Sequence, residues 1–235
     1  ALRAILNRAN AEGVGSVATY PFGRGGFEVS KLEEATAKRY LPAAELSKLK
    51  STTASNPQCE YARKLFLFSY YCYGISFIDM AMLTAAHIKQ MEDGDYIVYK
   101  RQKIKRQKGV KPISIKITPA IRQLIESLQA ASPTVDDFLL PVVTRSGYTG
   151  ERLYMHIRTR YSKYQKYLRL LAEELGIDFH LTSYVSRHTA AMTLQRNHIP
   201  REVISQMLGH ADLETTNVYL DSFDNGVINE AAKVL

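Results

Sequence analysis

Residues 181–191 read LTSYVSRHTAA, residues 204–210 read ISQMLGH and residues 215–220 read TTNVYL. Within these stretches Arg187 precedes His210 by 23 residues, and His210 precedes Tyr219 by nine. A guanidinium binds two phosphate oxygens, an imidazole exchanges protons near neutral pH, and an activated phenol can act as a nucleophile. None of the three stretches carries a pattern of metal ligands. The ordered set predicts a protein that breaks and rejoins a DNA strand through a covalent bond to phosphate.

Each of these residues also has a plainer interpretation when it is taken alone. The chain has 15 tyrosines, so Tyr219 is explained equally well by a helix that packs on the core. Arg187 and His188 fit an ordinary charged surface, and Gly209 fits the end of a helix. The prediction therefore depends on the order and spacing of the set.

The composition is that of a globular, basic protein. The chain has 235 residues, 46% of them hydrophobic, which suits one large domain or one domain with a fragment of another. Lys and Arg total 31 against 23 Asp and Glu, for a formal charge of +8. Such a surface attracts polyanions, and double-stranded DNA is the partner we expect.

Cysteines and hydropathy point to a cytoplasmic protein, which we expect to be bacterial and associated with the nucleoid because DNA is its expected partner. Cys59 and Cys72 form no CxxC pair and are expected to be reduced, partly buried thiols. No stretch approaches the roughly 18 to 20 apolar residues of a membrane span. No signal-peptide pattern is present, and the chain begins without Met inside a helical pattern, so we expect a fragment cut within a helix.

The pattern along the chain predicts a mainly α protein with one small antiparallel sheet of three strands. Strands are expected near residues 86–90, 95–100 and 112–117, where the last shows Ile alternating with polar residues. Helices are expected over 1–12, 42–49, 57–74, 77–83, 119–131, 151–175, 182–196, 200–208 and 213–221. The glycine-rich residues 13–40 are expected to be a linker, so the first helix belongs to a different domain.

Two segments combine basic residues with an expected position on the surface. Seven of the twelve residues from Lys100 to Lys111 are Lys or Arg, and they join two predicted strands as a mobile hairpin tip. Phosphate binding and simple solvation both explain such a run. The predicted helix over 151–175 interleaves basic residues with Tyr154, Tyr161, Tyr164 and Tyr167, which fits DNA contact, although its leucines show that it also packs.

The three quoted stretches resemble the C-terminal boxes of the tyrosine recombinases, also called phage integrases. Residues 181–191 are similar to that family's Arg-His box, residues 204–210 to its Leu-Gly-His box, and residues 215–220 to the segment that carries its nucleophile. Lys103 falls where the family keeps a hairpin lysine. The resemblance implies that residues 41–221 are a catalytic domain and residues 1–12 the last helix of a truncated core-binding domain. For the tail, residues 222–235, it implies docking on a neighbouring protomer, although packing on its own domain explains the apolar side of the tail equally well.

The resemblance also implies a reaction that uses no cofactor, metal or ATP. Tyr219 would form a 3′-phosphotyrosine, Arg187 and His210 would hold the phosphate, and Lys103 would protonate the leaving oxygen. We expect further DNA contacts from residues around these, namely Lys100, Arg101, Lys105, Arg106 and His188. The implied assembly is a homotetramer on paired DNA sites, with room for accessory DNA-bending proteins. Integration, excision and inversion of a mobile genetic element all remain open.

Two positions depart from the family pattern. The first clamp arginine is replaced by Ser76, and the histidine three residues before Arg187 is replaced by Tyr184. A tyrosine can still donate a hydrogen bond to phosphate, but loss of one charge-stabilising donor costs about 3 kcal/mol, or 100-fold or more in rate. We hypothesise that another cation supplies the charge. Arg63 and Lys64 lie on the same predicted helix, but Lys64 would be roughly 18 Å away along a straight helix. Only a break in that helix would let either of them help, so Arg101 in the hairpin is a freer candidate.

Three other functions remain open from the sequence alone. Ser76 is compatible with a catalytically weak relative that binds DNA and regulates. Residues 200–220 have the layout of a helix-turn-helix, although no Lys or Arg occurs from 213 to 220, where a DNA-reading helix would need them. A topoisomerase would use similar chemistry on one DNA site.

Overall fold

The computed structural model describes residues 2–23, 26–28, 40–105, 109–178 and 180–210. The chain divides into two compact units, residues 1–37 and residues 38–235. The first unit contains helix α1 (Leu2–Ala11) and a short 3-10 helix (Val17–Thr19). The rings of Tyr20, Phe22 and Phe27 meet edge to face within it. The helix predicted over residues 1–12 is confirmed.

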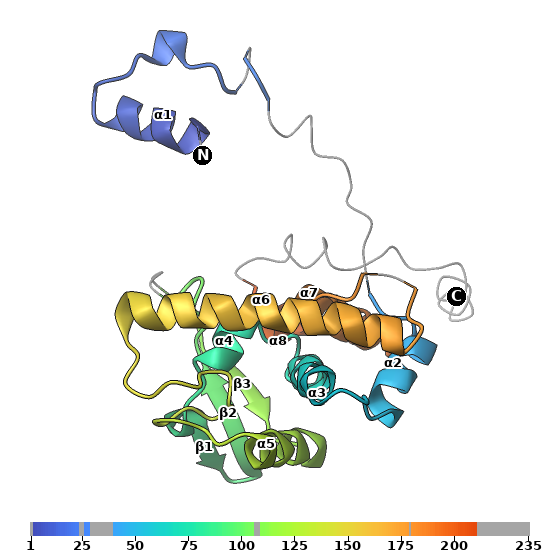
Figure 1. Cartoon of the computed structure of the whole chain (residues 1–235). Coiled ribbons are helices and arrows are strands. Elements are labelled where there is room, and N and C mark those ends of the chain that lie inside the picture. The colour runs from blue at the N-terminus through green and yellow to red at the C-terminus, as the bar shows by residue number, and fades with distance from the viewer. Residues whose placement is uncertain (1, 24–25, 29–39, 106–108, 179, 211–235) are drawn as a thin grey trace, which may run out of the picture. The chain divides into compact units, whose positions relative to one another are not determined.

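The second unit carries the remaining described helices and the sheet (Figure 1). Its elements follow the predicted order, and the helix predicted over residues 213–221 lies outside the described residues. In chain order they are α2 (Ala43–Ser51), α3 (Pro57–Tyr71), α4 (Phe77–Ala81), a 3-10 helix (Ala85–His87), β1 (Ile88–Met91), β2 (Gly94–Tyr99), β3 (Ile113–Lys116), α5 (Pro119–Ala131), α6 (Gly150–Glu174), α7 (Ser183–Arg196) and α8 (Arg201–Leu208).

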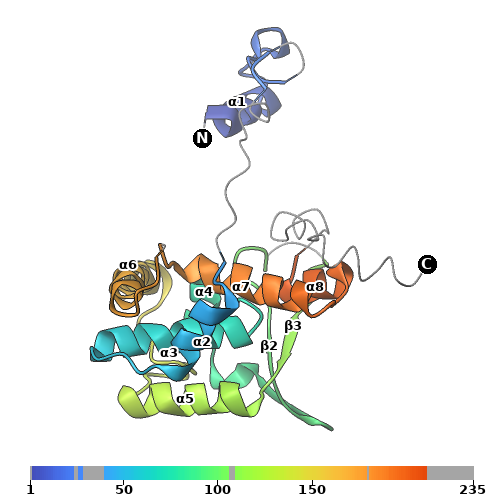
Figure 2. The same cartoon turned by 90° about the vertical axis from the view of Figure 1, so that its right-hand side faces the viewer.

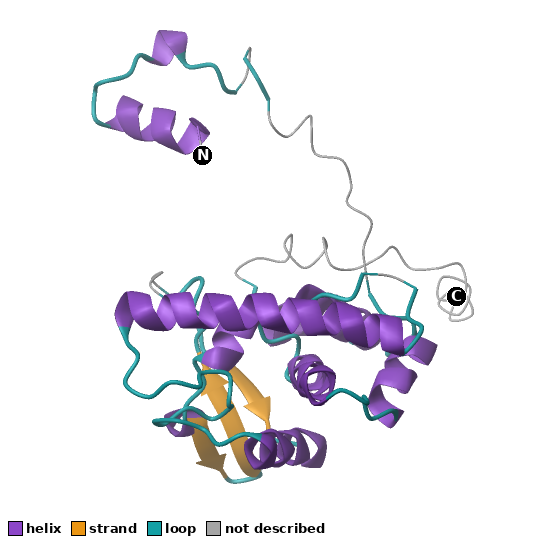
Figure 3. Ribbon diagram, viewed as in Figure 1, coloured by secondary structure: helices purple, strands orange, loops and turns teal. Residues whose placement is uncertain are grey.

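Helix α3 forms the centre of this unit. Its start is fixed by Asn56, whose side chain accepts hydrogen bonds from the backbone N–H groups of residues 58 and 59, and by Pro57 at the first helical position. Phe66 and Phe68 are fully buried on it. Helices α2, α5, α6 and α7 all pack against α3, and Figure 3 shows α3 enclosed between α6 and α5. The fold therefore builds outward from one apolar helix.

The sheet has the order β1-β2-β3, and both pairings are antiparallel. Ile97 on β2 lies opposite Ile115 on β3, and both side chains are fully buried. The alternation of buried and exposed residues on β3 matches the predicted period of two. Thr118 caps α5 through Ile121 N–H, as its sequence position predicts. The small antiparallel sheet is thus confirmed, with the basic residues 100–112 joining β2 to β3.

Helices α7 and α8 share a small core of their own. It consists of Ala191, Met192, Ile204 and Leu208. Helix α8 also contacts β3, and Figure 2 shows α8 at the end of α7 beside the sheet. This packing brings the C-terminal end of α8 to the end of β2 and the start of β3, where the candidate site lies.

The remaining sequence-level expectations concern thiols, metals and membranes. Cys59 and Cys72 are both buried and unpaired, and burial raises the pKa of each thiol. The described residues contain no group of three His, Cys, Asp or Glu side chains that could hold a metal ion. Across the described ranges, no helix has both the length and the apolar character required to cross a membrane.

Candidate active site

Arg187 is the centre of the candidate site and is almost completely buried on α7. Its Nη1 donates to the carbonyl oxygen of Gly74 at 3.0 Å, and its Nη2 donates to the carbonyl oxygen of Leu208 at 2.5 Å. Nη2 also lies 2.9 Å from Nε2 of His210. The guanidinium is therefore fixed by two chain segments far apart in sequence, and the predicted Arg187–His210 pair is brought together.

The tautomer of His210 follows from this contact. A guanidinium has only donors, so Nε2 of His210 must act as the acceptor. The imidazole is then neutral and carries its proton on Nδ1. A ring in this state can donate that proton in a hydrogen bond to an anion, which suits the predicted contact with phosphate.

Gly74 gives Arg187 the space that it occupies. The backbone of Gly74 is left-handed, with φ +72°, and a Cβ there would lie 2.5 Å from Cα of Arg187. Real Cβ atoms essentially never make so short a contact, and the Cα of Arg187 belongs to the backbone of the packed helix α7. The close approach of this loop to α7 thus requires glycine, for steric as well as conformational reasons.

Gly209, at the end of α8, also has a backbone conformation that favours glycine, and its close neighbours are side-chain atoms. It caps the helix in the left-handed conformation, with φ +63°. A Cβ there would lie 2.3 Å from Cδ1 of Ile113 and 3.2 Å from Cδ of Arg101. Gly209 is therefore a helix cap and also the point where the hairpin reaches the Arg187–His210 pair.

Arg101 belongs to this cluster. Its Nη1 donates to the carbonyl oxygen of Gly209 at 3.2 Å, and its side chain lines the same pocket as Ser76 and Arg187. The cation that sequence reasoning favoured as a substitute thus lies beside the candidate site. The buried Tyr99 is close enough to Arg101, Arg187 and Asp79 to be affected by their charges. Burial, reinforced by Asp79, raises the pKa of Tyr99, although Arg187 and Arg101 act in the opposite direction.

Ser76 has a structural role of its own. It is the N-cap of α4, accepting from the N–H of Asp79 at 3.2 Å and donating to Oδ2 of Asp79 at 2.6 Å. The other oxygen of Asp79 accepts from the backbone N–H of Gln102 at 2.7 Å. The buried Asp79 therefore fixes the residue between Arg101 and Lys103. Sequence reasoning missed this carboxylate, although Ser followed by Asp three residues later is a helix-start signal.

Arg63 and Lys64 play no part in the site. Helix α3 ends at Tyr71, so the assumption that they share a helix with Ser76 is wrong. Arg63 makes two 2.7 Å hydrogen bonds to the carboxylate of Glu60 and a third to the carbonyl oxygen of Leu49. Lys64 lies between Glu60 and the carbonyl oxygen of Ser127. Both cations have structural partners far from Arg187.

The other predicted DNA contacts lie along the β2–β3 connection. Lys100, Lys103 and Lys105 are exposed there, and Arg106 falls outside the described residues. Lys103 is two residues from Arg101, on the turn that Asp79 fixes. On α7, Tyr184 is half exposed and its ring meets that of His188 edge to face at 5.2 Å. Tyr219 lies outside the described residues, so its predicted role stays a prediction.

A pocket of about 460 Å³ opens between α4, α6 and the start of α7. Ser76, Arg101, Tyr184 and Arg187 all line it, so four candidate residues from three parts of the chain share one cavity. Arg158 of α6 also lines it. In the sequence Arg158 was only one member of a basic helix, and no local signal distinguished it from its neighbours.

The family of the chain follows from comparison with known proteins. Residues 39–225 match the model of the phage integrase family. This chain belongs to the phage integrase family. That assignment confirms the resemblance read from residues 181–220, and it favours a recombinase over a regulatory relative.

Curated relatives of this chain carry the name tyrosine recombinase. Tyrosine recombinase XerD of Brucella abortus biovar 1 is 30% identical over 121 residues, which are 48% of this chain and 36% of the relative. Tyrosine recombinase XerD of Halalkalibacterium halodurans is 41% identical over 54 residues, 23% of this chain and 18% of the relative. The matched part of the chain thus spans about a third or less of these relatives.

Solved recombinase structures share the fold of this chain. The crystal structure of XerA recombinase superimposes with a TM-score of 0.56 at 21% identity, covering 83% of this chain and 64% of that chain. The Tn1549 transposon integrase in complex with a circular intermediate DNA superimposes with a TM-score of 0.65 at 12% identity. The match covers 100% of this chain and 77% of that chain. The predicted mainly α catalytic fold is therefore confirmed.

Proposed function

We propose that this chain carries the catalytic part of a site-specific recombinase that cuts and rejoins double-stranded DNA through a phosphotyrosine. The observation that carries the proposal is the buried Arg187, fixed by two carbonyl oxygens and lying 2.9 Å from His210. Such a prearranged donor pair can stabilise the charge that develops on a phosphate under attack. Membership of the phage integrase family supports the same reaction class.

In the proposed reaction the phenol oxygen of Tyr219 loses its proton to water and attacks the phosphorus of a phosphodiester. The bond from phosphorus to the 5′ oxygen breaks, and Lys103 gives that oxygen a proton. The products are a 3′-phosphotyrosine and a strand with a free 5′-hydroxyl. In the second step the 5′-hydroxyl of a partner strand gives its proton to Lys103 and attacks the phosphotyrosine. The bond from phosphorus to the phenol oxygen then breaks, and Tyr219 is released and takes a proton from water.

Arg101 supplies the charge that Ser76 cannot give in this proposal. Its side chain lines the pocket with Arg187 and packs on Gly209, next to His210. A guanidinium keeps its charge at any physiological pH and binds phosphate with two parallel hydrogen bonds. Arg101 and Arg187 would then hold the phosphate from β2 and from α7. Tetramer assembly on paired DNA sites is proposed with the reaction.

A nicked suicide substrate tests the proposal, because it traps the covalent complex. The DNA is taken from the flanks of the gene in its own genome. Wild type should give a band shifted on a denaturing gel, and Tyr219→Phe should give none. Tyr167→Phe, which changes a tyrosine on α6, is the matched control and should keep the band. No shifted band with the full-length protein, alongside clear DNA binding, would contradict the proposal.

A further inference from the structure

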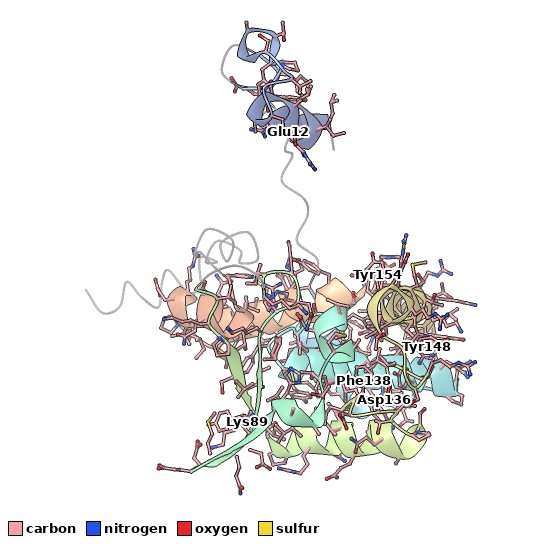
Figure 4. The ribbon with its side chains drawn as sticks, turned by 90° about the vertical axis from the view of Figure 1, so that its left-hand side faces the viewer. Glu12, Lys89, Asp136, Phe138, Tyr148 and Tyr154 are labelled. Atoms are coloured by element: carbon pink, nitrogen blue, oxygen red, sulfur yellow. The ribbon has the colours of Figure 1, made fainter. Side chains whose placement is uncertain are left out.

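The pocket beside Arg187 has a wall that the proposed strand cleavage does not use. Its volume of about 460 Å³ lies within the roughly 300–1,000 Å³ range of small-ligand sites. Phe77, Tyr154, Tyr161 and Tyr184 contribute rings to it from three helices. Figure 4 shows Tyr154 on α6, at the edge of the unit. This wall is therefore rich in aromatic rings. The same pocket is lined by Arg187, the residue that would hold the phosphate.

Among the exposed rings of this wall, Tyr161 has contacts at both its hydroxyl and its ring. Its hydroxyl lies 3.2 Å from Oγ of Ser183 and accepts from Nε2 of Gln165 at 3.0 Å. The ring also packs at 5.3 Å on Phe77, which in turn stacks on the buried Tyr164. Although 38% of Tyr161 is exposed, both ends of the side chain are held. Tyr161 therefore brings to the pocket that it lines a ring held by contacts at its hydroxyl and at its face.

Three guanidinium groups surround this aromatic surface. Arg101 follows β2, Arg158 lies on α6 and Arg187 lies on α7, and all three line the pocket. The described lining residues include no carboxylate, since Asp79 faces Ser76 and Gln102 instead. An aromatic surface with cations at its rim is the combination that binds a single unpaired nucleotide, whose base stacks while its phosphate pairs with Arg.

Ser76 keeps the pocket open. Its side chain turns back to Asp79 as a helix cap, so it adds little volume to the cavity that it lines. A longer side chain at this position would fill part of that space. The replacement that removes a charge from the site therefore also leaves room for a ligand next to Arg187.

We propose that this pocket binds one unpaired nucleobase of the DNA strand next to the cleaved phosphate. The base stacks on Tyr161, while Arg101 or Arg158 pairs with its phosphate. Strand exchange requires the cut strand to leave its duplex, and a site for an unstacked base would stabilise the strand at that stage. This inference rests on the proposed recombinase function.

Two nicked duplexes test the pocket, one with a single unpaired thymine beside the nick and one without it. Affinities are measured by fluorescence anisotropy with the Tyr219→Phe protein, which cannot form the covalent bond. Stacking of one base is worth about 1–3 kcal/mol, or roughly 5- to 150-fold in Kd. We expect the unpaired thymine to tighten binding by a factor in this range. Tyr161→Ala should remove the preference, and Tyr161→Phe should keep it.

A second variant and a crosslink separate stacking from misfolding. Tyr154→Ala changes a ring that is 58% exposed, so it should fold normally and still weaken the preference. Tyr167→Ala, on the same helix but outside this pocket, should leave the preference unchanged. With 5-iodouracil as the unpaired base, irradiation should attach the DNA to Tyr161 or Tyr154.

Equal affinity for the two duplexes would overturn the pocket proposal. So would a preference that survives in Tyr161→Ala, or a crosslink that forms at neither Tyr161 nor Tyr154. Neither result affects the covalent band on the suicide substrate, which reports strand cleavage alone. A missing covalent band with an intact thymine preference would instead overturn the recombinase proposal, so the two failures are distinguishable.

Discussion

The buried carboxylate of Asp79 accepts a hydrogen bond from the backbone N–H of Gln102 at 2.7 Å. This contact joins the start of α4 to the segment that follows β2. Gln102 lies between Arg101 and Lys103, the two cations to which the proposed reaction assigns phosphate binding and proton donation. One buried acid thus sets the position of two groups that must act on the same phosphate.

Asp79→Ala should therefore reduce strand cleavage more than it reduces DNA binding. The variant leaves the N–H of Gln102 without its charged acceptor, a loss of about 1.5–3 kcal/mol. Asp79→Asn keeps an acceptor oxygen and should lie between wild type and Asp79→Ala. Asp93→Ala removes an exposed carboxylate bound to Lys116 and serves as the control. Single-turnover formation of the covalent complex, with urea unfolding in parallel, measures both effects. Equal rates for Asp79→Ala and Asp93→Ala would contradict the assigned role.

Arg101→Ala should slow formation of the covalent complex by about 100-fold, because a charge-stabilising donor at the phosphate is lost. Arg101→Lys keeps the charge without the planar fork, so an intermediate rate is expected. The neighbouring exposed Lys100→Ala is the control and should change DNA affinity and its salt dependence only slightly. If Arg101→Ala and Lys100→Ala slow cleavage equally, Arg101 does not replace the missing clamp arginine.

Gly74→Ala should lower both stability and activity. The new Cβ would lie 2.5 Å from Cα of Arg187, at a residue whose φ is +72°. Gly147→Ala is a matched control, because Gly147 has φ +73° and nothing within 4 Å of its Cβ position. Both variants carry the left-handed strain of about 1–2 kcal/mol, and only Gly74→Ala adds the clash. Denaturant unfolding should therefore show a larger loss for Gly74→Ala, together with loss of cleavage. Equal losses would show that the loop moves freely away from α7.

Acidification should weaken the attachment of residues 141–149 to α6. Nε2 of His156 accepts from the N–H of Thr144 at 3.2 Å, so the bond needs the neutral ring. Burial lowers the pKa of His156, as do Arg160, Arg145 and Lys163. The folded state thus binds a proton less readily than the unfolded chain. The stabilisation is present above the ordinary His pKa, near 6.5, and is lost as pH falls through the lower folded value.

The pH dependence of unfolding in wild type and His156→Gln measures this effect. Gln offers a neutral acceptor that does not titrate. Wild type should lose stability more steeply than His156→Gln below about pH 6.5. Parallel curves for the two proteins would show that His156 contributes nothing to the acid sensitivity of the fold.

Local signals in the sequence were sufficient for most of the fold. Thr118 with Pro119 marked the start of α5, and the Ile alternation marked β3, because caps and pleats depend on neighbouring residues. The Arg187–His210 pair was also predictable, since both lie in motifs with a fixed spacing. The assignment of domains and the role of Tyr219 stay predictions.

Interactions between distant segments could not be predicted in this way. The contact of Asp79 with Gln102 joins α4 to the hairpin, and no periodicity in the sequence relates these residues. The helix predicted over residues 57–74 ends earlier, at Tyr71, because the chain turns at Tyr73 and Gly74, both with positive φ. The packing of the helices decides which cation reaches the site. It also decides which aromatic rings line the pocket.

The two carbonyl oxygens that hold Arg187 belong to Gly74 and Leu208, which lie 113 residues before and 21 residues after it. During synthesis, therefore, a nascent chain has no clamp until α8 has left the ribosome and packed on α7. The proposed nucleophile, Tyr219, also follows Leu208 in the chain. In the proposed reaction, the clamp and the nucleophile would therefore both be completed only near the end of synthesis, so an incomplete polypeptide would not cut DNA that it cannot rejoin.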